Sequence, residues 1–372
     1  MTLRPLSDDT FVTVLLCSGL GGKSNAASPL SRTEWNLLVR SLVRANWRPG
    51  DLLRWGIDAA RHDLGLADDM ASRLSHLLSQ SVRIASEVER LATSGIGVLS
   101  RADEAYPARW RSRLREQSPP LLFVTGPVGL LERGGIAVVG SRNVDPAGAD
   151  FARHVGSTAA RSRTPVISGG ARGVDREAMF GALEAGGEAI GILPDSLART
   201  LRAPEVRRWM AEGQLVLASP QRPDAGFHVG NAMGRNKLIY TLADAAVVIS
   251  SDVERGGTWA GATENLRHDW SPLFVRAGDD APTGNRRLLD LGAMPLHQAD
   301  LDAGRDGDLL HALLARADRA SRAGTSAPIQ RPLLDHGDDE REVVRDGRHL
   351  SATEVQGTLP TPAGDPGQLK LL

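Results

Sequence analysis

The sequence predicts an α/β protein: a doubly wound, mostly parallel, Rossmann-like sheet, preceded by a small helical domain and followed by a flexible tail. Two observations predict the sheet. Short segments that are apolar on both faces alternate with helical stretches through the middle of the chain, as buried parallel strands joined by helices do. Two of these segments run directly into glycine-rich turns, 140–142 and 168–173, at the point where a helix is expected to begin.

Residues 1–94 are predicted to form the helical N-terminal domain. Ser31 and Glu34 have the spacing of a capping box, and Trp35, Leu38 and Leu42 then recur at helical spacing. Small helical domains of this kind bind DNA or partners in some proteins and only pack in others. The sequence leaves both roles open for this one.

A connector, residues 95–132, follows with one or two strands, at 95–99 and 119–124. The Rossmann-like domain, which binds DNA or a nucleotide, is expected over 133–320, and the flexible tail, rich in Pro, Gly, Asp and Arg, over 321–372. The strands of the Rossmann-like domain are predicted at 136–139, 166–168, 189–193, 215–218, 246–250 and 273–275.

Composition excludes several classes of protein. The chain of 372 residues is 41% hydrophobic, and no apolar run approaches the roughly 20 residues of a membrane helix. The N-terminus lacks the pattern of a signal peptide, so a cytoplasmic protein without a membrane partner is expected. Cys17 is the only cysteine, which excludes an internal disulfide and a cysteine-built zinc site. No metal and no cofactor are expected.

A formal net charge of −1 gives the chain no general attraction to nucleic acid, so DNA binding requires a local basic site. Gly140, Ser141 and Arg142 are the first candidates for such a site. A glycine allows a phosphate to approach the backbone, and the hydroxyl and guanidinium supply donors. The alternative is an ordinary tight turn with a surface arginine.

The same chemistry recurs after the next predicted strand, at Ser168, Gly169, Gly170 and Arg172. Because neighbouring parallel strands end at the same edge of a sheet, the two turns are expected to line one crevice. Asp175, which follows, is interpreted as a helix cap rather than as a ligand-binding residue.

Arg235, Asn236 and Lys237 follow Gly234 and are predicted to open a helix over 238–243. Two cations at the start of a helix oppose its dipole, and a bound polyanion would offset that cost. The alternative is a pair of ordinary surface cations.

Gly256, Gly257 and Thr258 form a third glycine-rich turn, before a predicted helix over 259–268. Glu264, inside that helix, is either a general acid or base or a solvated helix residue. Few aromatic residues are available for base stacking, and Phe227, Tyr240 and Trp259 are the candidates.

Together these motifs resemble the DNA-processing protein A (DprA/Smf) family. The resemblance extends from about Ile96 to Leu296 and is carried by residues 139–142, 168–175 and 235–239, with 106–107 and 119–123 upstream. It implies a Rossmann-like core that binds single-stranded DNA without cleaving it, forms a homodimer, and loads a RecA-type recombinase. It also implies that Arg142, Arg172, Arg235 and Lys237 form a positive pocket over a floor of Ser141, Ser168, Gly169 and Gly170.

The chain departs from the family pattern in several places. Met179 stands where many members have histidine, and a Gly-Gly-Thr turn replaces the usual Ser-Gly-Ser type. The winged helix common at the family's C-terminus has no visible counterpart in 321–372. We therefore expect a divergent branch acting in DNA recombination, DNA uptake or defence against foreign DNA.

Two alternative functions follow from the same motifs. The Gly-Gly-Thr turn with Glu264 is similar to that of lysine-decarboxylase-like phosphoribohydrolases, which share the fold and cleave nucleoside monophosphates. In that case Arg142 and Arg172 hold the phosphate and Glu264 assists cleavage of the glycosidic bond. A nucleotide sensor without turnover is the other alternative.

The last five residues suggest a partner-binding segment. Gln368, Leu369, Leu371 and Leu372 form an apolar cluster at the end of the predicted tail, suited to a hydrophobic groove on a partner. The string resembles the peptides that bacterial replication proteins use to bind the sliding clamp. The alternative is that these leucines fold back onto the protein's own surface.

Overall fold

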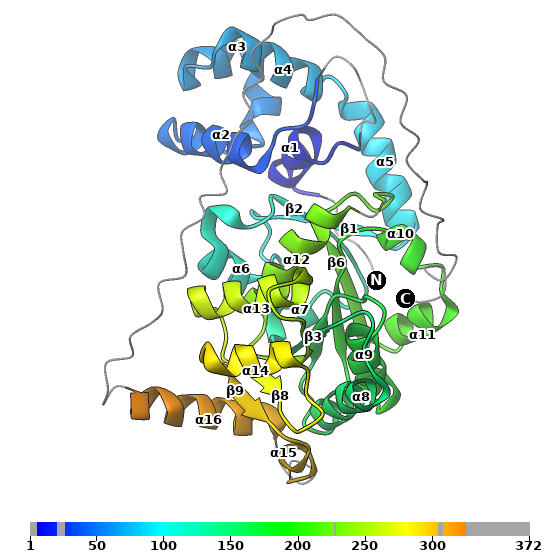
Figure 1. The fold of residues 1–372 in the computed structure, drawn as a ribbon. Helices are drawn as coiled ribbons and strands as arrows, with labels where there is room; N and C mark the ends of the chain where they lie inside the picture. The colour runs from blue at the N-terminus through cyan, green and yellow to red at the C-terminus, as the bar shows by residue number, and fades with distance from the viewer. Residues whose placement is uncertain (1–5, 21–26, 227, 304–307, 325–372) are drawn as a thin grey trace, which may run out of the picture. The chain divides into compact units, whose positions relative to one another are not determined.

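A nine-stranded sheet forms the centre of the part of the chain that is described, with helices on both of its faces (Figure 1). The computed structural model describes residues 6–20, 27–226, 228–303 and 308–324. The described residues up to Ala317 pack into one unit, which includes the N-terminal helices and the sheet. The domain boundaries predicted after residues 94 and 132 stay predictions.

The N-terminal segment is helical, as predicted. Ser31 caps its helix through the expected capping box: the hydroxyl accepts from the Glu34 N–H, and the Glu34 carboxylate accepts from the Ser31 N–H. Trp35, Leu38 and Leu42 are buried in a separate apolar cluster between these helices. The helices are α1 (Asp8–Cys17), α2 (Arg32–Arg44), α3 (Asp51–Leu64), α4 (Asp68–Leu78) and α5 (Ser81–Thr93).

The sheet confirms the predicted fold class. Its order is β1-β2-β6-β5-β4-β3-β7-β8-β9, with the strands from β3 onward parallel and β1 and β2 antiparallel at one edge. The strands are β1 (Gly97–Ser100), β2 (Leu121–Thr125), β3 (Ile136–Gly140), β4 (Val166–Ser168), β5 (Ala189–Ile192), β6 (Leu215–Ser219), β7 (Ala245–Ser250), β8 (Leu273–Arg276) and β9 (Met294–Leu296).

Strand β9 was not predicted. It is three residues long, contains Pro295 and pairs only with β8 at the edge of the sheet, so it carries little of the apolar pattern that marks the other strands.

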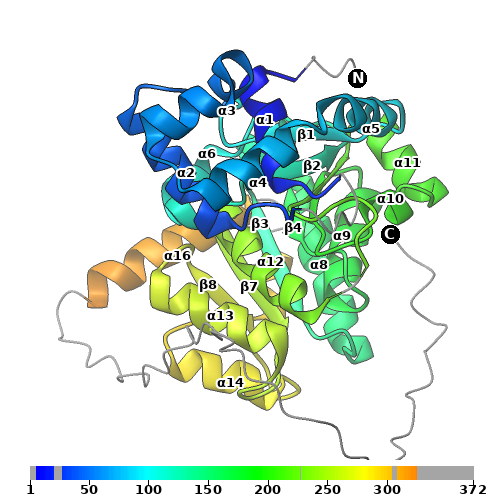
Figure 2. The same cartoon turned by 90° about the horizontal axis from the view of Figure 1, so that it is seen from above.

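Alternate residues of the central strands belong to two different apolar cores. Ile136 and Val138 of β3 pack on one face, whereas Ala137 and Val139 pack on the other. Helices α8 and α9 cover the first face and α12, α13 and α14 the second, as Figures 1 and 2 show. Both faces of the sheet are therefore buried, which explains why its strands are apolar throughout.

The helices that follow the N-terminal segment vary in length. They are α6 (Ala108–Leu114), the 3₁₀ helix η1 (Arg115–Gln117), α7 (Leu130–Arg133), α8 (Pro146–Arg161), α9 (Val174–Glu184), α10 (Leu197–Thr200), α11 (Pro204–Ala211), α12 (Val229–Leu242), α13 (Gly256–His268), α14 (Thr283–Asp290), α15 (Gln298–Ala303) and α16 (Leu309–Gly324).

Helix α16 runs past the boundary predicted at residue 320, because helical structure continues to Gly324. The rest of the predicted tail, including Gln368, Leu369, Leu371 and Leu372, lies outside the described residues. None of the described helices is both long and apolar enough to span a membrane.

Candidate phosphate-binding site

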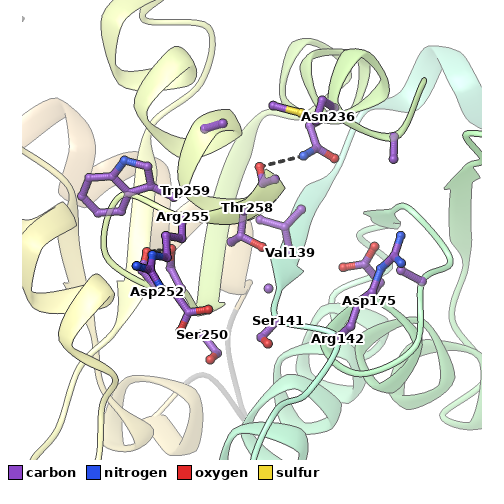
Figure 3. Close-up of a pocket in the computed structure, with 18 of the residues that line it drawn as sticks. Val139, Ser141, Arg142, Asp175, Asn236, Ser250, Asp252, Arg255, Thr258 and Trp259 are labelled. Carbon is purple, nitrogen blue, oxygen red and sulfur yellow. Dashed lines mark hydrogen bonds between the residues drawn. The ribbon is translucent and has the colours of Figure 1, made fainter. Parts of the chain in front are cut away.

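The strand order reverses at β3, with β4 on one side and β7 on the other. Ligands of doubly wound sheets bind outside the carboxyl ends of the strands at such a reversal. A pocket of about 630 Å³ lies there (Figure 3). This switch-point pocket is lined by residues 139–142, 171, 175, 232–233, 235–236, 240, 250–252 and 254–260.

The first predicted turn lines the pocket, as expected. Gly140 lies against Val174, whose Cγ2 would be 2.5 Å from a Cβ at this position, so a larger residue would displace α9. The N–H of Ser141 donates to the Ser250 carbonyl at 2.9 Å, which joins the turns after β3 and β7. Arg142 is exposed, and Figure 3 shows it near Asp175 on one side of the pocket.

The second predicted turn, after β4, does not line the pocket as expected. Ser168 is buried, and its hydroxyl donates to the Val138 carbonyl at 2.6 Å, so it braces the sheet. Arg172 is exposed and donates to the Asn143 side chain at 2.7 Å. Ser168, Gly169, Gly170 and Arg172 are all absent from the lining, and Ala171 and Asp175 take their place. Most of the lining comes from the segments after β3 and β7, which is the other neighbour of β3, and the segment after β4 contributes only Ala171 and Asp175.

A buried ion pair between Arg235 and Asp175 forms part of the pocket wall. The Arg235 side chain is 5% exposed, and its Nη1 lies 3.6 Å from Oδ2 of Asp175. Oδ2 also accepts from the Gly169 N–H at 3.1 Å, so Asp175 braces the preceding loop. Burial raises the pKa of the Asp175 carboxyl, against the opposing effect of Arg235, and burial lowers the pKa of Arg235.

The third predicted motif lies in mid-helix, which corrects two expectations. Helix α12 begins at Val229, so Arg235 to Lys237 do not open a helix and the argument from its dipole is wrong for them. Asn236 lines the pocket and donates from Nδ2 to the Gly257 carbonyl at 2.8 Å. Lys237 lies outside the pocket and pairs with Glu264 at 3.5 Å.

The Gly-Gly-Thr segment lines the pocket, as predicted. It belongs to the helix itself and is not a turn before the helix. Gly256, Gly257 and Thr258 form the first turn of α13 and all line the pocket. Within the described residues no side chain caps this end of the helix. Its N–H groups and the positive end of its dipole therefore suit an anion.

Sequence reasoning missed the loop between β7 and α13. Asp252, Glu254 and Arg255 line the pocket, as does Met233 of α12. The apolar ending of β7 and the glycines after it pointed to this loop, but not to the direction of its side chains. Two of the three predicted stacking candidates, Trp259 and Tyr240, line the pocket, and of these Tyr240 is buried. Phe227 is outside the described residues.

A doubly wound sheet with glycine turns and arginines at its switch point is the architecture of the Rossmann-like class of proteins. Over residues 97–302 the sequence matches the family model described as DNA recombination-mediator protein A. The match covers more than half of the chain, and the chain belongs to this family, which includes the DNA-processing protein A (DprA/Smf) proteins.

Two relatives illustrate the distance within the family. The DNA processing protein DprA of Bacillus subtilis is 24% identical over 212 residues, which cover 55% of this chain and 70% of that protein. The putative DNA processing protein DprA of Mycobacterium tuberculosis is 28% identical over 236 residues, 59% of each chain. The family is thus one of DNA processing and recombination.

A solved structure shares the fold. The DNA processing protein A (DprA) of Streptococcus pneumoniae superposes with a TM-score of 0.52 at 20% identity, covering 72% of this chain and 95% of that one. The family match therefore confirms the resemblance in sequence to the DprA/Smf family, and the solved structure confirms the fold.

Proposed function

We propose that this chain binds single-stranded DNA at the switch-point pocket and acts as a recombination mediator in DNA recombination, DNA uptake or defence against foreign DNA. One observation carries the proposal. Arg142 and the buried Arg235 face the same pocket as the uncapped first turn of α13. Guanidinium groups and helix N-terminal N–H groups are the donors that phosphate oxygens require.

The size of the pocket favours a single strand over a duplex. About 630 Å³ accommodates an exposed nucleotide unit. In a duplex the bases are paired and stacked between two backbones. Moving one base out of the stack and into the pocket costs unstacking energy. Trp259 in the lining offers a flat surface to an unpaired base.

The test is fluorescence anisotropy of the whole protein with labelled single-stranded and double-stranded oligonucleotides of the same sequence. We expect tighter binding of the single strand and a loss of affinity in Arg142→Ala. Arg267→Ala is the matched control, because Arg267 is an exposed arginine near the other end of α13. Absence of binding at low salt contradicts the proposal.

Hydrolysis of nucleoside monophosphates is the less favoured alternative. Glu264 would have to act on the glycosidic bond, but it does not line the pocket and its carboxylate pairs with Lys237. We therefore propose binding without turnover. Release of free base from a nucleoside monophosphate, followed by chromatography, would contradict this.

Three partners remain predictions. The family resemblance predicts a RecA-type recombinase and a second copy of the chain, and the C-terminal tail predicts the sliding clamp. The first two are tested by pull-down with the recombinase and by measuring the mass in solution. For the clamp, deletion of residues 368–372 should abolish binding and leave DNA binding unchanged.

A further inference from the structure

The charges around the switch-point pocket are balanced, which is unusual for a surface that follows a nucleic-acid backbone. Arg142, Arg235 and Arg255 line it, but so do three carboxylates. These belong to Asp175, beneath the pocket, and to Asp252 and Glu254, exposed on the loop after β7. Exposed carboxylates repel a continuing chain of phosphates, whereas a groove that follows a strand is positive along its length.

The two sides of the pocket differ in their net charge, although each carries both signs. Figure 3 shows Arg142 beside Asp175 on one side of the pocket, and Asp252, Arg255 and Trp259 together on the other side. An anionic group therefore fits the side of Arg142 and Arg235. The opposite side has two carboxylates against the single guanidinium of Arg255, together with an indole ring. It fits an uncharged group that donates hydrogen bonds and has a flat face.

The anion side carries buried polar groups whose hydrogen bonding is incomplete. Among the described residues, Nε of Arg235 and the hydroxyl of Tyr240 find no hydrogen-bond partner, and Nη1 of Arg235 has only its ion pair with Asp175 at 3.6 Å. Both residues line the pocket. Arg235 is 5% exposed and Tyr240 1% exposed. Buried polar groups without partners are rare in folded proteins and point to a ligand that completes them. The open N–H groups of the first turn of α13 face the same space.

We propose that the pocket holds one nucleotide as a phosphate monoester, with the phosphate at Arg142, Arg235 and the α13 N-terminus. The base then lies against Trp259, and the base or sugar donates to Asp252 or Glu254. The source of this nucleotide is either a free nucleoside 5′-monophosphate or the 5′-phosphorylated end of a strand. This inference deepens the proposed function and rests on it, since it names the unit that the same pocket binds.

Isothermal titration of the whole protein tests the inference. The probes are deoxyadenosine 5′-monophosphate, deoxyadenosine and inorganic phosphate. We expect the nucleotide to bind at least about tenfold more tightly than either part alone, because both sides of the pocket are then filled. We expect Trp259→Ala to weaken nucleotide binding at least about fivefold and to leave phosphate binding nearly unchanged. Arg142→Ala should weaken the binding of both, and Arg267→Ala of neither.

Two strands of one sequence, with a 5′-phosphate or a 5′-hydroxyl, distinguish the sources. If the protein prefers the phosphorylated strand, the pocket binds a strand end. If both strands bind equally and the free nucleotide displaces them, the pocket binds the free nucleotide. If the strands bind and the nucleotide shows no heat up to about 1 mM, the inference is wrong and the proposed function stands. If the nucleotide binds and no strand does, the proposed function is wrong. Melting temperatures of the variants confirm that each is folded.

Discussion

The guanidinium of Arg235 lies across the Cα of Gly169, so closely that a Cβ on this glycine would be 1.1 Å from Nη1. The Gly169 N–H, in turn, donates to Asp175, the ion-pair partner of Arg235. The glycine of the β4 turn therefore serves the pocket indirectly, by leaving room for a buried arginine. This explains its place in the motif better than a direct contact with phosphate does.

Gly169→Ala should destabilise the protein by about 2–4 kcal/mol, because Arg235 must leave its buried position or the loop must move. Gly234→Ala is the matched control. A Cβ at Gly234, an exposed position inside α12, meets nothing within 4 Å, and alanine there should raise stability by up to about 1 kcal/mol. Chemical denaturation measures both changes, and equal stability of the Gly169 variant and wild type would contradict the packing argument.

Arg142→Ala should change the salt dependence of single-strand binding as well as its strength. A pocket that holds few phosphates predicts a shallow log–log slope, between about −1 and −2, and the variant should lose about 0.7 of it for each phosphate contact removed. Anisotropy titrations at several salt concentrations give the slope. A slope that stays unchanged while affinity falls would mean that Arg142 acts on the fold and not on phosphate.

Lys237→Ala should leave DNA binding within about twofold of wild type, since Lys237 pairs with Glu264 outside the pocket. The pair is partly buried, so a double-mutant cycle with Glu264→Gln should give a coupling of about 0.2–1 kcal/mol in stability. A large loss of DNA affinity in Lys237→Ala would restore the role expected from the sequence.

Glu34→Gln should remove a pH-dependent contribution to stability. Hydrogen bonds from Arg73, more than those from Ser31, lower the pKa of Glu34 from its ordinary 4.5 to about 2. A lowered pKa in the folded state stabilises the protein above pH 4.5, and this contribution disappears as the pH falls from 4.5 to 2. The variant should be about 1 kcal/mol less stable at neutral pH, a figure reduced for partial exposure, and the difference should shrink on acidification. Glu89→Gln, at an exposed position of α5, is the control, and melting curves from pH 7 to about pH 3 measure both variants.

The sequence predicted the sheet well because burial on both faces leaves a local signature. Each strand from β3 to β8 is a short apolar run, and all of them except β5 end in glycine or a polar residue. That pattern needs no knowledge of neighbouring strands. Strand β9 lacks this pattern, because Pro295 sits in an edge strand with one partner.

The site was predicted only in part, because strand order is not a local property. Consecutive motifs suggested a crevice between β3 and β4, whereas β7 is the neighbour that opens the pocket. Helix register caused the second error. Arg235, Asn236 and Lys237 are adjacent in sequence, but a turn of α12 directs Arg235 and Asn236 into the pocket and Lys237 toward Glu264.

The N-terminal helices share apolar packing with the sheet. Leu15 and Leu91 belong to the same core as Ile136 and Val138, and the Thr10 and Ser100 hydroxyls are 2.8 Å apart. A chain shortened to residues 97–302, the segment that matches the family, would therefore expose an apolar face of the sheet and the edge strand β1 to water. Such a fragment should aggregate. Over evolutionary time, exchange of these helices for another module would demand matching changes in the sheet beneath them.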